Sequence, residues 1–170
     1  VAFVGRSNSG KSSCINGLTR RKSLARSSAV PGRTRLINLF QVSDGNNSIL
    51  LVDLPGFGYS QAGKSTARQW QEMCQGYLAR PNILVVLLED VRRKPDPMLS
   101  DLLKTLGPGA KCVMVFTKID KVKKSQRKKL FVERSKEVAQ WGVEQSFFIS
   151  VIEKGSLDTL RDYILAPKPS

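Results

Sequence analysis

The chain has 170 residues, 41% of them apolar, which suffices to bury the core of one domain of ordinary size. Lys and Arg total 28 against 14 Asp and Glu, so the formal net charge of +14 predicts a polyanionic partner. The sequence contains no histidine, which excludes a Ser-His-Asp triad, a His general base and a His-ligated zinc. Three scattered cysteines without C-x-x-C spacing indicate reduced thiols, and no apolar run is long enough to predict a membrane partner.

Apolar runs and amphipathic stretches alternate along the chain, which predicts a doubly wound α/β fold. Strands are expected at residues 1–4, 36–42, 48–53, 82–89, 111–117 and 146–150. Helices are expected at residues 11–18, 65–79, 96–106, 125–140 and 156–165. We expect a single domain over residues 1–170, with a frayed tail at 166–170.

Two features predict a mostly parallel sheet. The runs at 82–88 and 112–116 are continuously apolar, as in central parallel strands covered on both faces. One pair should be antiparallel, because a hairpin-type turn, Ser43-Asp44-Gly45-Asn46-Asn47, separates two strands. Apolar stripes predict which helix faces meet the core, and they are formed by Trp70 and Tyr77 in one helix and by Leu130, Phe131, Val138 and Trp141 in another.

A phosphate-binding loop is predicted directly after the first strand, at Gly5-Arg6-Ser7-Asn8-Ser9-Gly10-Lys11-Ser12. This run matches G-x-x-x-x-G-K-[ST], in which glycines let backbone N–H groups point at a phosphate. Lys11 should reach the β- and γ-phosphates, Ser12 should ligate Mg²⁺, and Ser13 should continue the site at the helix start. An ordinary Gly/Ser turn is the alternative, but the flanking strand and helix favour binding of a nucleoside triphosphate.

The segment Asp53-Leu54-Pro55-Gly56 ends the third predicted strand. A carboxylate there can hold Mg²⁺ through water, and the backbone N–H of Gly56 can bond the γ-phosphate. The motif by itself more often marks a simple turn. The phosphate loop in the same chain favours the interpretation as a metal and phosphate site. A further metal ligand is expected at Thr34, which together with Gly32 and Arg33 lies in the loop before the second strand.

The segment Thr117-Lys118-Ile119-Asp120 is a variant of the N-K-x-D guanine motif and ends another apolar run. A carboxylate at Asp120 can accept two hydrogen bonds from guanine that adenine does not offer, so GTP is favoured over ATP. The stem of Lys118 can lie against the base. The loop after the last strand should complete the base pocket through Phe148, Ile149 and Ser150.

Basic residues gather in three clusters, which favour nucleic acid as the polyanion over solvated helix faces. The first contains Arg20, Arg21, Lys22, Arg26, Arg33 and Arg35. The second contains Lys121, Lys123, Lys124, Arg127, Lys128 and Lys129. The third is Arg92-Arg93-Lys94.

With these motifs together, the chain resembles the EngB (YihA/YsxC) family of translation-factor-like GTPases over essentially its whole length. The resemblance is carried by the phosphate loop and by Lys22-Ser23-Leu24-Ala25-Arg26, Pro31-Gly32-Arg33-Thr34, Leu36-Ile37-Asn38-Leu39-Phe40, Asp53-Leu54-Pro55-Gly56-Phe57-Gly58-Tyr59 and Thr117-Lys118-Ile119-Asp120. It implies a Ras-like six-stranded fold and a role in assembling the large ribosomal subunit. The loop at Ile149-Ser150-Val151-Ile152-Glu153-Lys154-Gly155 departs from the family's Ser-Ser-x-x-x-x-G pattern.

Hydrolysis is expected to be slow, because Phe57 stands where Ras-type GTPases place a water-orienting Gln. The catalytic set is therefore predicted to be Lys11, Thr34 and Gly56, with Asn8 helping to hold K⁺ against the phosphates. Two functional classes follow: a GTP-controlled switch that binds ribosomal RNA, or a nucleotide-bound RNA-binding assembly protein whose hydrolysis is incidental. An ATPase or kinase is the third possibility, and Asp120 argues against it. We expect a monomer in the bacterial cytoplasm, the alternative being the mitochondrial matrix or another organelle of bacterial descent.

Overall fold

The computed structural model describes residues 1–25, 37–43, 48–57 and 64–165, of which residues 64–67 are described by their backbone. The strands are β1 (Ala2–Gly5), β2 (Asn38–Ser43), β3 (Ser48–Asp53), β4 (Leu84–Asp90), β5 (Lys111–Thr117) and β6 (Gln145–Phe148). The helices are α1 (Lys11–Leu18), α2 (Lys64–Leu78), α3 (Pro97–Leu103), α4 (Lys124–Ala139) and α5 (Asp158–Leu165), with a 3₁₀ helix η1 (Ile119–Lys121).

The strands form one six-stranded sheet in the order β2-β3-β1-β4-β5-β6. Only β2 and β3 pair antiparallel, from Asn38 opposite Asp53 to Ser43 opposite Ser48, as the turn between them predicts. The pairs β1–β3, β1–β4, β4–β5 and β5–β6 are parallel. Strands β2 and β3 lie on one side of β1, and strands β4, β5 and β6 lie on the other. The carboxyl ends of β3, β1 and β4 therefore meet at a topological switch point, where α/β proteins bind ligands.

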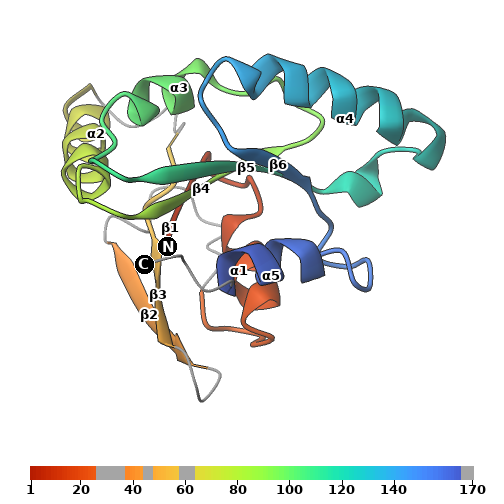
Figure 1. Ribbon diagram of the computed structural model, residues 1–170, viewed down its shortest axis with the longest axis horizontal. Helices are drawn as coiled ribbons and strands as arrows, with labels where there is room; N and C mark the ends of the chain where they lie inside the picture. The colour runs from red at the N-terminus through yellow and green to blue at the C-terminus, as the bar shows by residue number, and fades with distance from the viewer. Residues whose placement is uncertain (26–36, 44–47, 58–63, 166–170) are drawn as a thin grey trace.

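Helices cover both faces of the sheet (Figure 1). On one face α2, α3 and α4 bury a cluster that includes Leu78, Leu99, Leu102, Val138 and the alternate strand residues Val85 and Leu87. On the other face α1 and α5 bury Ile15, Leu160 and Ile164 against Phe3, Val86 and Leu88. Since both faces are covered, every residue of β4 is buried, which is why its sequence is continuously apolar until Glu89.

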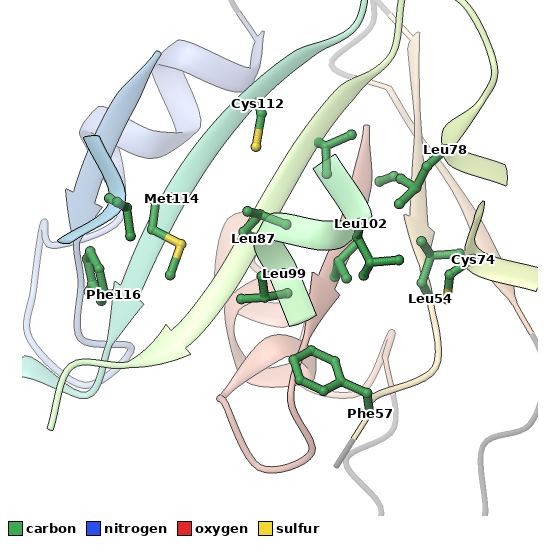
Figure 2. Packing of buried hydrophobic residues seen from close by; sticks show 14 of the residues in the cluster. Leu54, Phe57, Cys74, Leu78, Leu87, Leu99, Leu102, Cys112, Met114 and Phe116 are labelled. Carbon is green, nitrogen blue, oxygen red and sulfur yellow. The ribbon is translucent and has the colours of Figure 1, made fainter. Parts of the chain in front are cut away.

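The first cluster reaches the end of the sheet where the predicted site lies. Figure 2 shows Phe57 at one end of this cluster, near Leu99, and Cys74 beside Leu54 and Leu78. The predicted apolar stripes are confirmed, because Trp70, Tyr77, Leu130, Phe131 and Trp141 all pack against the cluster and Val138 lies within it.

Helix α3 ends at Leu103, three residues earlier than the sequence predicts. Asp96 caps its start by accepting a hydrogen bond from the backbone N–H of Met98 at 3.0 Å. At its end, the N–H groups of Lys104, Thr105 and Leu106 bond carbonyls three residues back, at 3.3, 3.0 and 3.3 Å. The hydroxyl of Thr105 also donates to the Leu102 carbonyl at 2.7 Å, so the last turn tightens and the α-helix stops.

Strand β4 begins at Leu84, later than the predicted start at residue 82, because Asn82 has a left-handed φ of 55° and its N–H bonds the Pro108 carbonyl. The 3₁₀ helix η1 was not predicted. None of the helices in the described ranges combines the length and the apolar content that crossing a bilayer requires.

Candidate nucleotide-binding site

The loop between β1 and α1 curls tightly at the switch point. Asn8 and Gly10 have φ of 64° and 90°, a left-handed conformation in which glycine and asparagine are the least strained residues. Gly5 permits a close approach, because a Cβ there would lie 2.7 Å from both the Leu88 carbonyl oxygen and Ser9 Oγ. Both the sequence pattern and the backbone conformation are those of a loop that can wrap around a small anion.

Helix α1 starts at this loop with Gly10 as its N-cap. Gly10 has no side chain to cap the helix, so the first N–H groups of α1 and the positive end of its dipole face the loop. Ser13 lies exposed on the first turn. An anion bound here receives backbone hydrogen bonds and the favourable dipole potential together.

Lys11 and Asp53 meet across the switch point. The Lys11 ammonium donates a hydrogen bond to Asp53 Oδ1, and their side chains are only 11% and 6% exposed. Asp53 ends β3 and lies opposite Phe3 of β1, so the parallel pairing of these strands brings the carboxylate to the phosphate loop. The predicted phosphate ligand and the predicted metal ligand are therefore neighbours.

The residues present fit Mg²⁺. The hydroxyl of Ser12 and the carboxylate of Asp53 are hard oxygen donors, which this ion prefers. Within the described ranges no group of three or more His, Cys, Asp and Glu side chains gathers to hold a metal. The third predicted ligand, Thr34, lies outside the described residues, as do Gly32 and Arg33.

Backbone hydrogen bonds attach the segment after β3, residues 54–57, to the phosphate loop. Ser7 N–H donates to the Phe57 carbonyl at 2.9 Å, and Phe57 N–H donates to the Gly5 carbonyl at 3.4 Å. Gly56 lies against Ser7, because a Cβ at Gly56 would be 2.9 Å from Ser7 Oγ and 3.2 Å from Ser7 N. The predicted glycine at a γ-phosphate position is thus in contact with the phosphate loop.

Buried side chains hold this segment in place. Leu54 and Pro55 are buried, and the Pro55 carbonyl accepts a hydrogen bond from Trp70 Nε1 at 2.6 Å. The Phe57 ring is 4% exposed and packs on Trp70 with ring centroids 5.4 Å apart. The sequence assigned Trp70 to packing and did not predict its hydrogen bond. The Phe57 side chain points into the core and has no polar atom, so it cannot orient water.

The predicted base-recognition residues meet at the ends of β5 and β6. Ser150 Oγ donates a 2.7 Å hydrogen bond to Asp120 Oδ1, and Ser150 N–H donates to Ser156 Oγ at 2.8 Å. Burial raises the pKa of Asp120, but hydrogen bonds from Ser150 and Lys121 outweigh burial and lower it overall. Asp120 is therefore an ionised acceptor held by its neighbour, as recognition of two guanine donors requires.

Thr117 and Lys118 connect this end of the site to the phosphate loop. Thr117 Oγ1 donates to the Ser9 carbonyl at 2.5 Å, across 108 residues of sequence. Lys118 has φ of 62°, and its ammonium donates to the Asn8 carbonyl at 2.6 Å. Thr117 thus braces the loop although it replaces the motif's usual asparagine.

Two other predicted site residues point into the core. The Phe148 ring stacks between Phe116 and Phe131, at centroid distances of 5.0 and 4.1 Å. Ile149 is 1% exposed in the opposite core cluster. Their side chains therefore pack in the core beneath the Ser150 loop, and their part in nucleotide binding stays a prediction. Arg6, another predicted nucleotide-binding residue, instead pairs with Asp96 at the start of α3, at 3.0 Å.

The sequence analysis missed two acidic residues at the end of β4. Asp90 accepts a bidentate pair from Arg92, and Glu89 is 1% exposed with no hydrogen-bond partner for Oε1 among the described residues. Burial raises the pKa of Glu89 to about 7, with a further rise from Asp96. The signal was present, since two acids end an otherwise apolar strand at the switch point.

Comparison with known proteins agrees with this geometry. The family model described as 50S ribosome-binding GTPase matches residues 1–118. A probable GTP-binding protein EngB from Geobacter sulfurreducens is 44% identical over 160 residues, which cover 91% of this chain and 75% of that protein. The protein of the same description from Christiangramia forsetii is 42% identical over 168 residues, covering 96% and 83%.

Solved structures share the fold. A crystal structure of a probable GTP-binding protein engB aligns with a TM-score of 0.66 and 22% identity, covering 96% of this chain and 95% of that one. Era, in complex with MgGDPNP and nucleotides 1506–1542 of 16S ribosomal RNA, aligns with a TM-score of 0.76 and 23% identity. The alignment covers 99% of this chain but 57% of Era, so the chain spans little more than half of that protein.

The sequence matches cover most of the chain, and the six-stranded mostly parallel sheet with its P-loop is the fold of these GTPases. The chain belongs to the 50S ribosome-binding GTPase family and, within it, to the EngB GTP-binding proteins.

Proposed function

We propose that this GTPase is a nucleotide-controlled switch that binds ribosomal RNA and acts in assembly of the large ribosomal subunit. The observation that carries the proposal is a row of exposed lysines that starts next to Asp120, formed by Lys121, Lys123, Lys124, Lys128 and Lys129. These lysines lie between the end of η1, which contains Asp120, and the first half of helix α4. The family model's description as a 50S ribosome-binding GTPase supports the same partner.

Two arginines of the predicted clusters do not belong to this surface. Arg127 forms a bidentate pair with Glu153, at 3.0 and 2.6 Å, and Arg92 forms one with Asp90. Arg93 and Lys94 remain exposed, as do Arg20, Arg21 and Lys22 after α1. Arg26, Arg33 and Arg35 lie outside the described residues. The RNA-contacting surface is therefore proposed to be mainly lysine.

The proposed chemistry is transfer of the γ-phosphoryl group of GTP to water. Lys11 and the first N–H groups of α1 hold the phosphates, and Gly56 offers a backbone N–H beside Ser7. Ser12, Thr34 and, through water, Asp53 would hold Mg²⁺, which would supply positive charge against the phosphates when bound. No side chain in this set is a general base, and the buried Phe57 does not orient water. Intrinsic turnover is therefore expected to be slow.

An activating cation is proposed at Asn8. Its side chain is exposed at the phosphate loop, while its carbonyl is occupied by Lys118. K⁺ bound there would place positive charge beside the phosphates, as an arginine finger does elsewhere. Turnover should be faster in KCl than in NaCl at matched ionic strength. Asn8→Gly removes the side chain without straining the left-handed backbone, and it should abolish the difference. Equal rates in both salts for the unaltered protein would refute the K⁺ site.

Binding to large ribosomal subunits tests the switch. Pelleting with subunits should be tighter with a non-hydrolysable GTP analogue than with GDP, because the Thr34 hydroxyl is proposed to join the metal only when the γ-phosphate is present. Each neutralised phosphate adds about −0.9 to the slope of log K against log salt on a duplex, so six contacts give about −5. Reversing the charge of Lys124 and Lys128 should flatten this slope.

Lys104 and Lys136 provide the matched control, since both are exposed and reversing them changes the net charge equally. Loss of binding in both double variants would mean a response to net charge alone. Binding that ignores nucleotide would favour the alternative, an RNA-binding assembly protein whose hydrolysis is incidental. Stimulation of turnover by large subunits separates the two, because only a switch requires it. The relatives named above are bacterial, which supports the proposal that the protein acts in the bacterial cytoplasm. We also propose that it acts as a monomer.

A further inference from the structure

Asp90 is a buried carboxylate that gathers two cations at the end of β4. It is 4% exposed, and Arg92 donates to it from Nε and Nη2 at 2.9 and 2.6 Å. The ammonium of Lys118 lies 3.2 Å from Asp90 Oδ2. Burial raises the pKa of Asp90, but the hydrogen bonds from Arg92 and Lys118 lower it overall, to about 2. The carboxylate is therefore ionised throughout the physiological range.

Lys118 is held at both ends. Its backbone occupies a left-handed conformation directly after β5, and its ammonium lies between the Asp90 carboxylate and the Asn8 carbonyl. The strands fix the distance between these groups, because Asp90 pairs with Thr117 in the β4–β5 register and Val91 N–H donates to the Thr117 carbonyl at 3.1 Å. A lysine stem has several rotatable bonds, and anchoring its ammonium removes most of their freedom before a ligand arrives.

Arg92 gives the carboxylate its orientation. A fork of two hydrogen bonds fixes the plane of the Asp90 carboxylate, and Arg92 N–H adds a third contact at 3.1 Å. The Arg92 side chain is itself half-exposed. Its hydrogen bonds to Asp90 raise its pKa, and the charge of Asp120 adds a smaller rise. The three charges form one network beside Asp120.

We propose that Asp90 is a positioning residue for guanine-nucleotide binding, which acts by fixing the Lys118 ammonium against the phosphate loop so that the lysine stem is aligned with the base. This inference rests on the proposed assignment of Lys118 and Asp120 to the base pocket. Asp90 does not contact the nucleotide in this account. Its effect passes through Lys118, and it serves GDP and GTP alike because it is remote from the γ-phosphate.

A double-mutant cycle tests the inference in the full chain. Asp90→Asn, Lys118→Met and the double variant are titrated with MgGDP and with a Mg²⁺-bound non-hydrolysable GTP analogue. Asp90→Asn should weaken both nucleotides equally, by about tenfold. In the Lys118→Met background the same change should have an effect of less than about twofold, because the group it positions is gone. Equal effects in the two backgrounds would overturn the inference.

A purely structural role for Asp90 predicts a different result. Thermal unfolding without nucleotide would then shift, while the dissociation constants of the folded protein stayed unchanged, and this outcome also overturns the proposal. Arg92→Gln provides a second variant that should leave the fold intact, because the Arg92 side chain is 51% exposed. It should weaken both nucleotides less than Asp90→Asn does, and no change at all would remove Arg92 from the network.

The matched control is Glu144→Gln. Glu144 also contacts a strand lysine, Lys111 at 3.4 Å, but at the amino end of β5, the opposite end of the strand that precedes Lys118. It should leave both dissociation constants unchanged. Asp120→Asn tests the base pocket separately, through the preference for guanine over xanthine. If Asp120→Asn inverts that preference and Asp90→Asn has no effect, only the positioning inference fails; if Asp120→Asn changes nothing, the pocket assignment fails first.

Discussion

The two halves of the candidate site differ in how their charged groups are satisfied. In the base half, Asp120 is bonded by Ser150 and Asp90 is bonded by Arg92 and Lys118, and both pKa values are lowered. In the phosphate half, Lys11 donates a hydrogen bond to Asp53, although Lys11 is predicted to bind phosphate and Asp53 is predicted to hold Mg²⁺. Within the described residues, Ser9 Oγ and Glu89 Oε1 are buried there without a hydrogen-bond partner.

This difference indicates where ligand binding reorganises the protein. The base half already holds its acceptors and its lysine in place, so guanine recognition costs little ordering. In the proposed function Lys11 binds phosphate and Asp53 binds Mg²⁺ through water, so nucleotide binding is expected to exchange the Lys11–Asp53 pair for these contacts. We therefore expect binding energy to be spent on rearrangement in the phosphate half.

The largest effect is expected at the phosphate half, from Lys11→Ala. Removing the ammonium leaves Asp53 buried without its partner and the phosphates without a cation, so triphosphate affinity should fall about a thousandfold. Titration with a fluorescent GTP analogue measures the loss. Lys104→Ala, an exposed lysine on the α3 side, should not change the affinity. A Lys11→Ala protein that still bound GTP tightly would show that the phosphate half lies elsewhere.

The buried carboxyl group of Glu89, whose Oε1 has no hydrogen-bond partner among the described residues, predicts a pH-dependent stability. Its pKa is raised to about 7 by burial and by Asp96, against the opposing charges of Arg6 and Arg93. Between about pH 4.5 and 7 the unfolded chain releases a proton that the folded chain keeps, so stability falls as pH rises and levels off above 7. The decrease should reach about 3 kcal/mol at most.

Glu89→Gln mimics the protonated side chain and should remove this decrease. Urea unfolding at pH 5 and pH 8 measures it, as the difference between variant and unaltered protein. Glu144→Gln is the control, because the hydrogen bond from Tyr163 lowers the pKa of Glu144. The stability of this variant relative to the unaltered protein should therefore not rise between pH 5 and pH 8. A parallel slope for the unaltered protein and Glu89→Gln would mean that Glu89 is paired in solution.

A smaller and more selective effect is expected at the base half. Asp120→Asn replaces an acceptor with a group that also donates, so guanine affinity should fall at least about tenfold and xanthine affinity should rise. ATP should already bind the unaltered protein at least about tenfold more weakly than GTP. Competition titrations with GTP, XTP and ATP measure these ratios. Equal affinity for ATP and GTP in the unaltered protein would contradict the guanine assignment.

The smallest effect concerns Thr34, which lies outside the described residues. Thr34→Ala should weaken binding of a Mg²⁺-bound GTP analogue by about fivefold and leave GDP binding unchanged, since the hydroxyl is proposed to join the metal only with a γ-phosphate. Ser12→Ala is the comparison, because a ligand from the phosphate loop serves the metal with either nucleotide. If Thr34→Ala weakens both nucleotides equally, Thr34 does not read the γ-phosphate.

Much of the fold follows from local sequence patterns. Continuous apolar runs predicted the central strands, and alternating helices and strands predicted the doubly wound sheet, because burial on both faces demands those patterns. Boundaries were less predictable, as at α3, where hydrogen bonds of Thr105 tighten the last turn. Such endings depend on backbone geometry and not on periodicity.

The sequence by itself determined which chemical groups stand at the strand ends: Lys11 and Ser12 after β1, Asp53 after β3 and Asp120 after β5. Only the tertiary structure decided how these groups pair, because parallel strands bring together residues far apart in the chain. The Thr117–Ser9 bond, the Arg127–Glu153 pair and the Asp90 network depend on that register, as does the isolation of Glu89. Composition counts charges, but burial and neighbours determine which of them are free to bind a ligand.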